Sequence, residues 1–187
     1  TSSHIEWKDR DCHFIFGDVC TAVIIERADS ASAKNVWEVV GTHLETRFSN
    51  NIRNNFGFMN RSEDSDPEAR DKTFRQEGRK VFKEVVPIAV AHMEAHLGKL
   101  GQTAAQVRRF WLHQANLGMN QLVLKKLVGD ASHDRAPLIL DEFANTASAG
   151  SIIAFHKFNR DLESGDIGVI CSFGAGYSVG SVVVRKH

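Results

Sequence analysis

Residues 108–129 read RRFWLHQANLGMNQLVLKKLVG, and this stretch decides the fold. Its first part is rich in aromatic and apolar residues, which predicts a buried strand that leads into a loop at His113. The segment NQLVLKKLVG then has helical spacing and stops at Gly129, a common residue at a helix C-terminus. On its own, a histidine on an apolar segment is more often a buried structural residue than a catalyst.

The same alternation of strands and helices extends to both sides of this stretch. Strands are predicted at 13–16, 20–26, 35–45, 136–143, 167–173 and 177–186. Helices are predicted at 78–97, where Pro87 interrupts the pattern, in a short segment after Thr103, and at 146–166. Residues 46–75 have no clean period and are expected to form a long loop. This order indicates a layered α/β architecture.

The composition excludes several classes of protein. The chain has 187 residues, 42% of them hydrophobic and 25% charged, which is typical of one soluble globular domain. Its 23 basic and 23 acidic residues balance, so nothing indicates a nucleic-acid or membrane partner. Neither a transmembrane run nor a signal peptide is recognisable. Three cysteines do not make a disulfide framework, and a cytoplasmic location is expected.

Three local patterns suggest chemistry that is weakly supported. His92 and His96 stand one helical turn apart, but Met93 occupies the place of the glutamate in the HExxH metal motif, so a solvated helix face without metal is expected. The cysteines lack the electropositive setting of a reactive thiol. The glycine-rich 173–180 has no helix behind it, so it is either a hairpin turn or a turn that brings backbone N–H groups to a ligand.

Three motifs in order carry a more specific signal: HQAN at 113–116, NTASAG at 145–150 and SFGAGYSVGS at 172–181. Together they resemble the C-terminal half of the β-ketoacyl-ACP synthase III family in the thiolase superfamily. The segments FIFGDVCTAVIIE (14–26) and GRKVFKEVV (78–86) are also similar to that family. The resemblance implies a thiolase-like layered α/β/α half with a mixed sheet. Residues 1–34 would be a strand pair from the end of the N-terminal half, and residues 35–187 the C-terminal domain.

The resemblance also implies an activity, the decarboxylating Claisen condensation of an acyl thioester with malonyl-ACP in fatty-acid synthesis. By the family pattern, His113 and Asn145 of this chain would donate hydrogen bonds to the enolate formed when CO₂ leaves. Both side chains can donate. A backbone N–H at Ala175 would complete the oxyanion hole, and Phe173 would lie beside the nucleophilic thiol. No metal or redox cofactor is implied, because CoA or acyl carrier protein enters as part of the substrate.

Further positions match residues that bind the substrate or the carrier. Asn116 falls where the family contacts the pantetheine arm. Lys83, Lys125 and Lys126 match basic positions that dock the acidic acyl carrier protein, although ordinary solvated lysines fit as well. Gly118 stands where many members have a docking arginine. The segment FGDVCTA replaces small residues of the family pattern FGDGAGA with Val19, Cys20 and Thr21, which alters packing near the acyl tunnel or the dimer interface.

The family's nucleophilic cysteine lies upstream of anything present here. The chain alone is therefore expected to be inactive and to need the N-terminal half, in an enzyme that is a homodimer. Two alternatives stay open: a condensing enzyme of secondary-metabolite or signal synthesis, and a non-catalytic thiolase-like partner subunit.

Overall fold

The computed structural model describes residues 1–53, 72–129 and 134–187 of the chain. Its centre is a four-stranded mixed sheet with the order β1-β6-β5-β4. The strands are β1 (Trp37–Ser49), β4 (Val107–Leu112), β5 (Ile167–Gly174) and β6 (Gly176–Lys186). Strands β4 and β5 are parallel, whereas β6 is antiparallel to both of its neighbours, β5 and β1. The predicted mixed sheet is confirmed.

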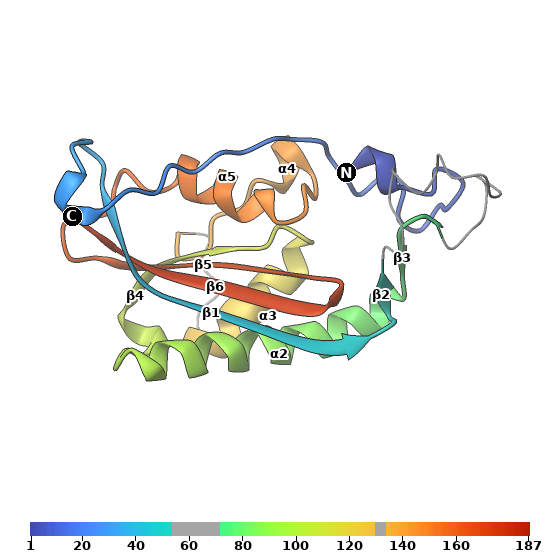
Figure 1. Ribbon diagram of the computed structural model, residues 1–187. Coiled ribbons are helices and arrows are strands. Elements are labelled where there is room, and N and C mark those ends of the chain that lie inside the picture. The colour runs from blue at the N-terminus through green and yellow to red at the C-terminus, as the bar shows by residue number, and fades with distance from the viewer. Residues whose placement is uncertain (54–71, 130–133) are drawn as a thin grey trace.

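Helices cover both faces of this sheet (Figure 1). One face carries α2 (Gly78–Lys99) and α3 (Leu117–Val128), and the other carries α4 (Leu140–Phe143) and α5 (Ala149–Lys157). Short elements complete the described chain: η1 (Ser2–His4), η2 (Ala28–Ser30), η4 (Ala104–Gln106), and the paired β2 (Ile52–Arg53) and β3 (Arg75–Gln76). The layered α/β/α architecture is confirmed.

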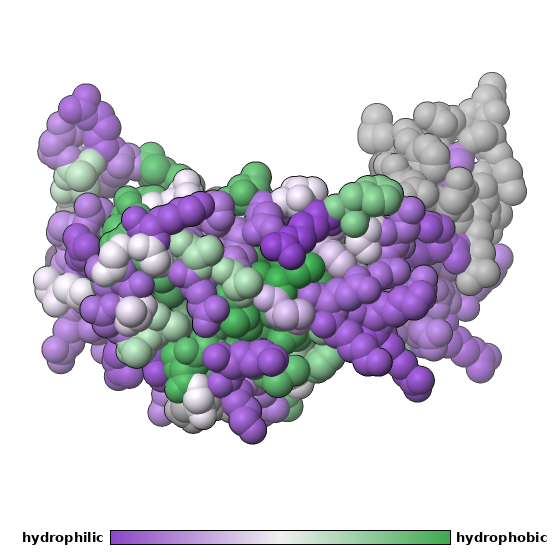
Figure 2. All heavy atoms as spheres, turned by 90° about the horizontal axis from the view of Figure 1, so that it is seen from below, coloured by the Kyte–Doolittle hydropathy of each residue, from purple (hydrophilic) through white to green (hydrophobic). Residues whose placement is uncertain are grey.

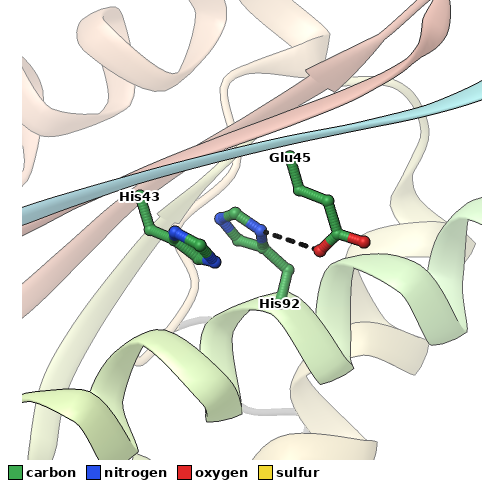
Figure 3. Close-up of side chains that lie close together, drawn as sticks. All are labelled: His43, Glu45 and His92. Atoms are coloured by element: carbon green, nitrogen blue, oxygen red, sulfur yellow. Dashed lines mark ion pairs between the residues drawn. The ribbon is translucent and has the colours of Figure 1, made fainter.

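Each face of the sheet buries its own core. The larger core lies under α2 and α3 and includes Met93, Leu97, Phe110 and Leu124. The smaller core lies under α5 and is built around Trp111. On the α2 side, hydrophilic side chains cover much of the outer surface, and hydrophobic ones gather near the middle (Figure 2). The alternation of β1 turns His43 and Glu45 towards α2 (Figure 3).

The ends of the predicted elements follow their local signals. Helix α3 ends before Gly129, which adopts a left-handed conformation with φ of 73°. Thr103 and Gln106 form a reciprocal capping box around η4. Pro87 lies within α2 on its exposed side, and the helix continues past it.

Two predicted strands near the N-terminus are wrong for this chain. Residues 13–16 form turns apart from an isolated bridge between Phe16 and Asn145, and residues 20–26 form no strand. Ile24 and Ile25 are 91% and 80% exposed. Their β-branched side chains favour a strand, but a strand also needs a partner, and no described residue pairs with them. The assignment of residues 1–34 to another half stays a prediction.

Three other expectations also need correction. The apolar segment 136–143 is a loop followed by α4 rather than a strand. Ile139 and Phe143 pack on the α5 side of the sheet without joining the ladder, and Ala136 belongs to the larger core. The helix predicted at 146–166 is only Ala149–Lys157. In the expected 46–75 loop, β1 continues to Ser49 and β2 pairs with β3, whereas 54–71 lie outside the described residues.

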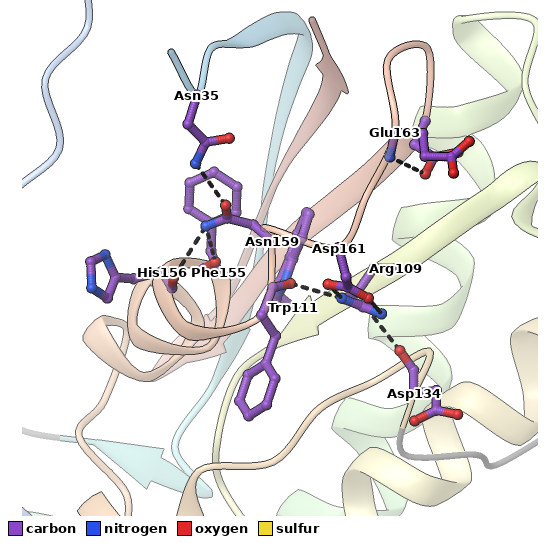
Figure 4. Close-up of polar contacts among 11 residues, drawn as sticks. Asn35, Arg109, Trp111, Asp134, Phe155, His156, Asn159, Asp161 and Glu163 are labelled. Carbon is purple, nitrogen blue, oxygen red and sulfur yellow. Dashed lines mark hydrogen bonds and ion pairs between the residues drawn. The ribbon is translucent and has the colours of Figure 1, made fainter. Parts of the chain in front are cut away.

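A polar cluster ties the end of α5 to β4 (Figure 4). The guanidinium of Arg109 donates to both carboxylate oxygens of Asp161, at 2.6 and 2.8 Å, and to the carbonyls of Asp134 and Phe158. The indole N–H of Trp111 also donates to the Phe158 carbonyl, at 2.9 Å. That indole covers Gly168, where an added Cβ would lie 2.2 Å from the ring. The cluster therefore fixes the loop that follows α5 against the sheet.

Asp161→Asn should lower the free energy of unfolding by about 1 kcal/mol, because the ion pair is bidentate but its carboxylate is exposed. Arg109 holds the pKa of Asp161 below its ordinary value of 3.8. The stabilisation is therefore present above that pH and is lost as the pH falls through the lower, folded-state pKa. Urea unfolding between pH 7 and pH 3 checks this. The exposed Glu163→Gln is the control, and a difference that does not shrink in acid would contradict the ion pair.

Candidate active site

A cavity of about 670 Å³ gathers segments that are far apart in the sequence. Five predicted site residues line it: His113, Asn116, Asn145, Phe173 and Ala175. The remainder of its lining is largely apolar and comes from the N-terminal segment, β2, α2 and α3, including Ile5, Phe16, Ile52, Val85 and Met119. Among the described residues, no carboxylate side chain lines the cavity.

His113 follows the last residue of β4 and is almost fully buried. Its ring packs against that of Phe173, with the centroids 4.6 Å apart. Burial lowers the pKa of His113 to about 4, although the backbone of Ala147 partly opposes the shift. The ring is therefore neutral near pH 7 and carries one N–H donor and one lone pair. Such a group can stabilise an anion without first requiring a proton from solvent.

The backbone of Asn145 is held by the N-terminal segment around Phe16. Its backbone N–H donates to the carbonyl of Ile15, and its carbonyl accepts from the N–H of Gly17, both at 2.9 Å. The side-chain oxygen accepts from the backbone N–H of Ala147 at 3.0 Å. This bond fixes the amide plane, and the NH₂ group, which can only donate, is available to a ligand.

The backbone around Asn145 is strained. Ala144 and Ala147 have positive φ values of 55° and 54°, a backbone conformation that residues other than glycine rarely adopt. Each such residue costs on the order of 1–3 kcal/mol, and the cost persists only where the surroundings enforce it. The strain is consistent with a backbone shaped to present the Asn145 amide.

Gln114 is a positioning residue that the sequence interpretation did not single out. It is fully buried, and its amide donates to the carbonyls of Leu112, at 2.9 Å, and Pro137, at 3.3 Å. Its side-chain oxygen accepts from the N–H of Ile139 at 3.1 Å. Gly150 packs so closely against it that an added Cβ would lie 2.9 Å from the Gln114 Cβ. The motifs HQAN and NTASAG are therefore in direct contact, a contact that neither motif reveals alone.

The remaining predicted binding residues have structural partners of their own. Asn116 caps α3 by accepting from the N–H of Met119 at 2.8 Å, and its amide NH₂ is still available as a donor. Its contact with a pantetheine arm stays a prediction. Ala175 lies exposed between β5 and β6, and its carbonyl accepts from the N–H of Ser178. Lys83, Lys125 and Lys126 are exposed and do not line the cavity. The two α3 lysines stand in the last helical turn, where they also stabilise the helix dipole. Their carrier-docking role stays a prediction.

The three cysteines have different environments. Cys12 and Cys171 are buried, whereas Cys20, which falls in the segment 20–26 that forms no strand, is exposed. Burial raises the pKa of Cys12 to about 11 and that of Cys171 to about 12, so both are protonated thiols at neutral pH. Neither lines the cavity, and Cys20 does not line it either. The described residues therefore supply no nucleophilic thiol to this site.

The helix face that carries His92 and His96 was expected to be solvated, and that expectation is wrong. Both side chains are buried, at 1% and 3% exposure. They lie between α2 and the sheet, and a ring nitrogen of each is within 2.9 Å of the Ser181 hydroxyl. They are buried because β6 and β1 pass directly over this part of α2, a contact that a helical pattern alone does not reveal.

Known proteins share both the sequence and the fold. A family profile described as "3-Oxoacyl-[acyl-carrier-protein (ACP)] synthase III C terminal" matches residues 97–186. A β-ketodecanoyl-[acyl-carrier-protein] synthase of Pseudomonas aeruginosa is 59% identical over the whole chain, which covers 53% of that protein. Residues 97–186 are therefore similar to the C-terminal part of 3-oxoacyl-ACP synthase III, and the whole chain is similar to about half of the Pseudomonas synthase.

More distant relatives show the same similarity. A β-ketoacyl-[acyl-carrier-protein] synthase III of Methylococcus capsulatus is 26% identical over 98% of the chain and 55% of its own length. The crystal structure of the Aquifex aeolicus synthase III has a TM-score of 0.74 at 21% identity, over 98% of the chain and 54% of that structure. The chain spans about half the length of the relatives that it matches. Among its described residues, no helix is long and apolar enough to cross a membrane.

Gln114→Leu should lower the free energy of unfolding by about 2–3 kcal/mol, because three buried backbone groups lose their partner. The change keeps the side chain's approximate volume, so packing loss contributes little. Chemical denaturation compared with Gln121→Leu, a half-buried glutamine on α3, measures the effect. Equal stability of the two variants would show that the Gln114 amide does not hold these segments together.

Proposed function

We propose that this chain supplies the enolate-stabilising half of a decarboxylating β-ketoacyl-ACP synthase III-type acyltransferase. The observation that carries the proposal is the convergence of two neutral donors, His113 and Asn145, on one apolar cavity beside Phe173. When malonyl thioester loses CO₂, negative charge develops on the thioester oxygen. Donors fixed in a site that excludes water stabilise such charge more strongly than water does.

The chain's own residues suit each part of this step. The neutral His113 ring donates through one N–H, and the Asn145 amide donates because its oxygen is held by Ala147. The described cavity lining contains no carboxylate that would repel the anion. The resulting carbanion attacks the acyl group on a cysteine of the N-terminal half, which forms the new carbon–carbon bond and releases the thiolate. The backbone N–H of Ala175 completes the oxyanion hole for the acyl-transfer steps.

The name of the most similar relative reported above suggests the substrates. The 59%-identical relative is named for a β-ketodecanoyl product, and each condensation adds two carbons. We therefore propose an eight-carbon acyl thioester as primer and malonyl-ACP as extender, in fatty-acid synthesis. Asn116 would contact the pantetheine arm, and Lys83, Lys125 and Lys126 would attract the acidic carrier protein. We further propose that the complete enzyme is a cytoplasmic homodimer. Its condensation reaction needs no metal or redox cofactor.

In the complete enzyme, His113→Ala and Asn145→Ala should each reduce malonyl decarboxylation by on the order of 100- to 1000-fold. Transfer of the acyl primer to the enzyme should be largely spared, because that step does not form the enolate. Radiolabelled CO₂ release and intact-mass detection of the acyl-enzyme measure the two steps separately. His156→Ala, an exposed histidine on α5, is the matched control. Equal loss of both steps would contradict the assigned roles.

Residues 1–187 alone should form no ketoacyl product, because the cavity has no reactive thiol from the described residues. Incubation of the purified chain with octanoyl-CoA and malonyl-ACP, followed by mass spectrometry of the carrier-bound products, tests this. Adding the N-terminal half should restore product. Product from the isolated chain would refute the division of labour, and a natural partner half without a cysteine nucleophile would favour a non-catalytic scaffold.

A further inference from the structure

A second group of side chains with potential metal-ligand atoms lies outside the cavity, between β1 and α2 (Figure 3). His43 and Glu45 project from β1, and His92 projects towards them from α2. One potential ligand atom from each residue lies within 4.8 Å of the other two. None of the three lines the cavity that holds His113 and Asn145.

His92 is the central residue of this group. Its side chain is fully buried, and its Nε2 atom lies 2.9 Å from the Ser181 hydroxyl. Its Nδ1 atom is buried without a hydrogen-bond partner and faces a carboxylate oxygen of Glu45 at 3.7 Å. That distance is too long for a hydrogen bond. A buried nitrogen in a polar setting without a partner requires an explanation.

The Ser181 hydroxyl restricts how the two histidines share protons. It contacts Nε2 of His92 and Nδ1 of His96, at 2.9 and 2.7 Å, but it has a single proton to donate. When Ser181 donates to His96, its oxygen accepts the Nε2–H of His92. The Nδ1 atom of His92 then carries a lone pair that points towards an anionic oxygen. The His92 nitrogen and the Glu45 oxygen are then both acceptors, and a cation between them would satisfy both.

We propose that His43, Glu45 and His92 form a binding site for one divalent transition-metal ion of the zinc type, with solvent in the remaining coordination position. Two imidazoles and a carboxylate are a donor set that such ions favour over Mg²⁺ or Ca²⁺, which prefer oxygen ligands. The Ser181 hydroxyl would accept the second ring N–H of His92, the arrangement that usually orients a metal-bound histidine. The ion would link strand β1 to helix α2.

Binding requires limited local rearrangement. The rings of His43 and His92 are stacked, with centroids 4.6 Å apart, so His43 must turn to aim a nitrogen at the shared position. Glu45 must release Arg47, to which it is bound at 2.5 Å in an exposed ion pair of small energetic value. Lys99 lies 3.4 Å from Nε2 of His43 and would move outward. His43 and Glu45 are both partly exposed, which gives these movements room.

The test uses the complete protein that carries residues 1–187, stripped of metal with a chelator. Cobalt titration followed by visible absorption reports ligand type, and zinc affinity is measured by competition with a chromophoric chelator. One Co²⁺ ion per chain should bind without the near-ultraviolet band that thiolate ligands produce. His43→Asn and Glu45→Gln should each weaken zinc binding at least about tenfold, and Ser181→Ala about 10- to 100-fold.

Two matched variants control for binding elsewhere on the chain. Glu38→Gln removes another carboxylate from β1, and His156→Ala removes an exposed histidine, so both should keep the original affinity. His43 and Glu45 are partly exposed, so their variants are expected to fold, which circular dichroism verifies. The proposal fails when the unmodified protein shows no saturable binding near pH 7, or when these two variants lose no more affinity than the controls.

Discussion

The side-chain amide of Gln114 holds together the two segments on which the candidate active site depends. It joins the end of β4, which His113 follows directly, to the segment before α4, which leads into Asn145. No sheet ladder connects these two segments, since 136–143 does not form a strand. The hydrogen bonds of a buried side chain therefore connect these segments, as backbone hydrogen bonds connect neighbouring strands of the sheet. The close packing of Gly150 against Gln114 leaves little freedom for either segment to shift.

Long periodic segments were predictable because their signals are local. Helix α2, helix α3 and strands β4 to β6 each carry a clear hydrophobic period and a recognisable end, such as Gly129. The segment 136–143 was misassigned because Ile139 and Phe143 are buried on the α5 side without entering the sheet. Apolar runs of that length do not distinguish a strand from a packed loop. Only the tertiary arrangement decides between them.

The candidate site was predictable to the extent that its residues stand in recognisable motifs. Five residues that the family resemblance singled out line one cavity: His113, Asn116, Asn145, Phe173 and Ala175. What the residues alone could not reveal is how each is oriented. The Asn145 oxygen is occupied by a backbone N–H two residues on, and the Asn116 oxygen caps a helix. These local bonds decide which atoms remain for a ligand, and they depend on backbone angles that no motif records.

His92 shows why the spacing of residues within one helix is a poor guide to metal binding. The sequence HMEAH lacks the glutamate of a single-helix motif, which argued against a metal. In the folded chain His92 instead meets a histidine and a glutamate from β1, a strand that precedes α2 by many residues. The i, i+2 spacing of His43 and Glu45 puts both on one face of that strand. Ligands gathered across a strand and a helix leave no contiguous signature, so only the packing of β1 on α2 brings them together. His113 differs because its lone, neutral ring faces an open apolar cavity, where a developing anion rather than a cation would be stabilised.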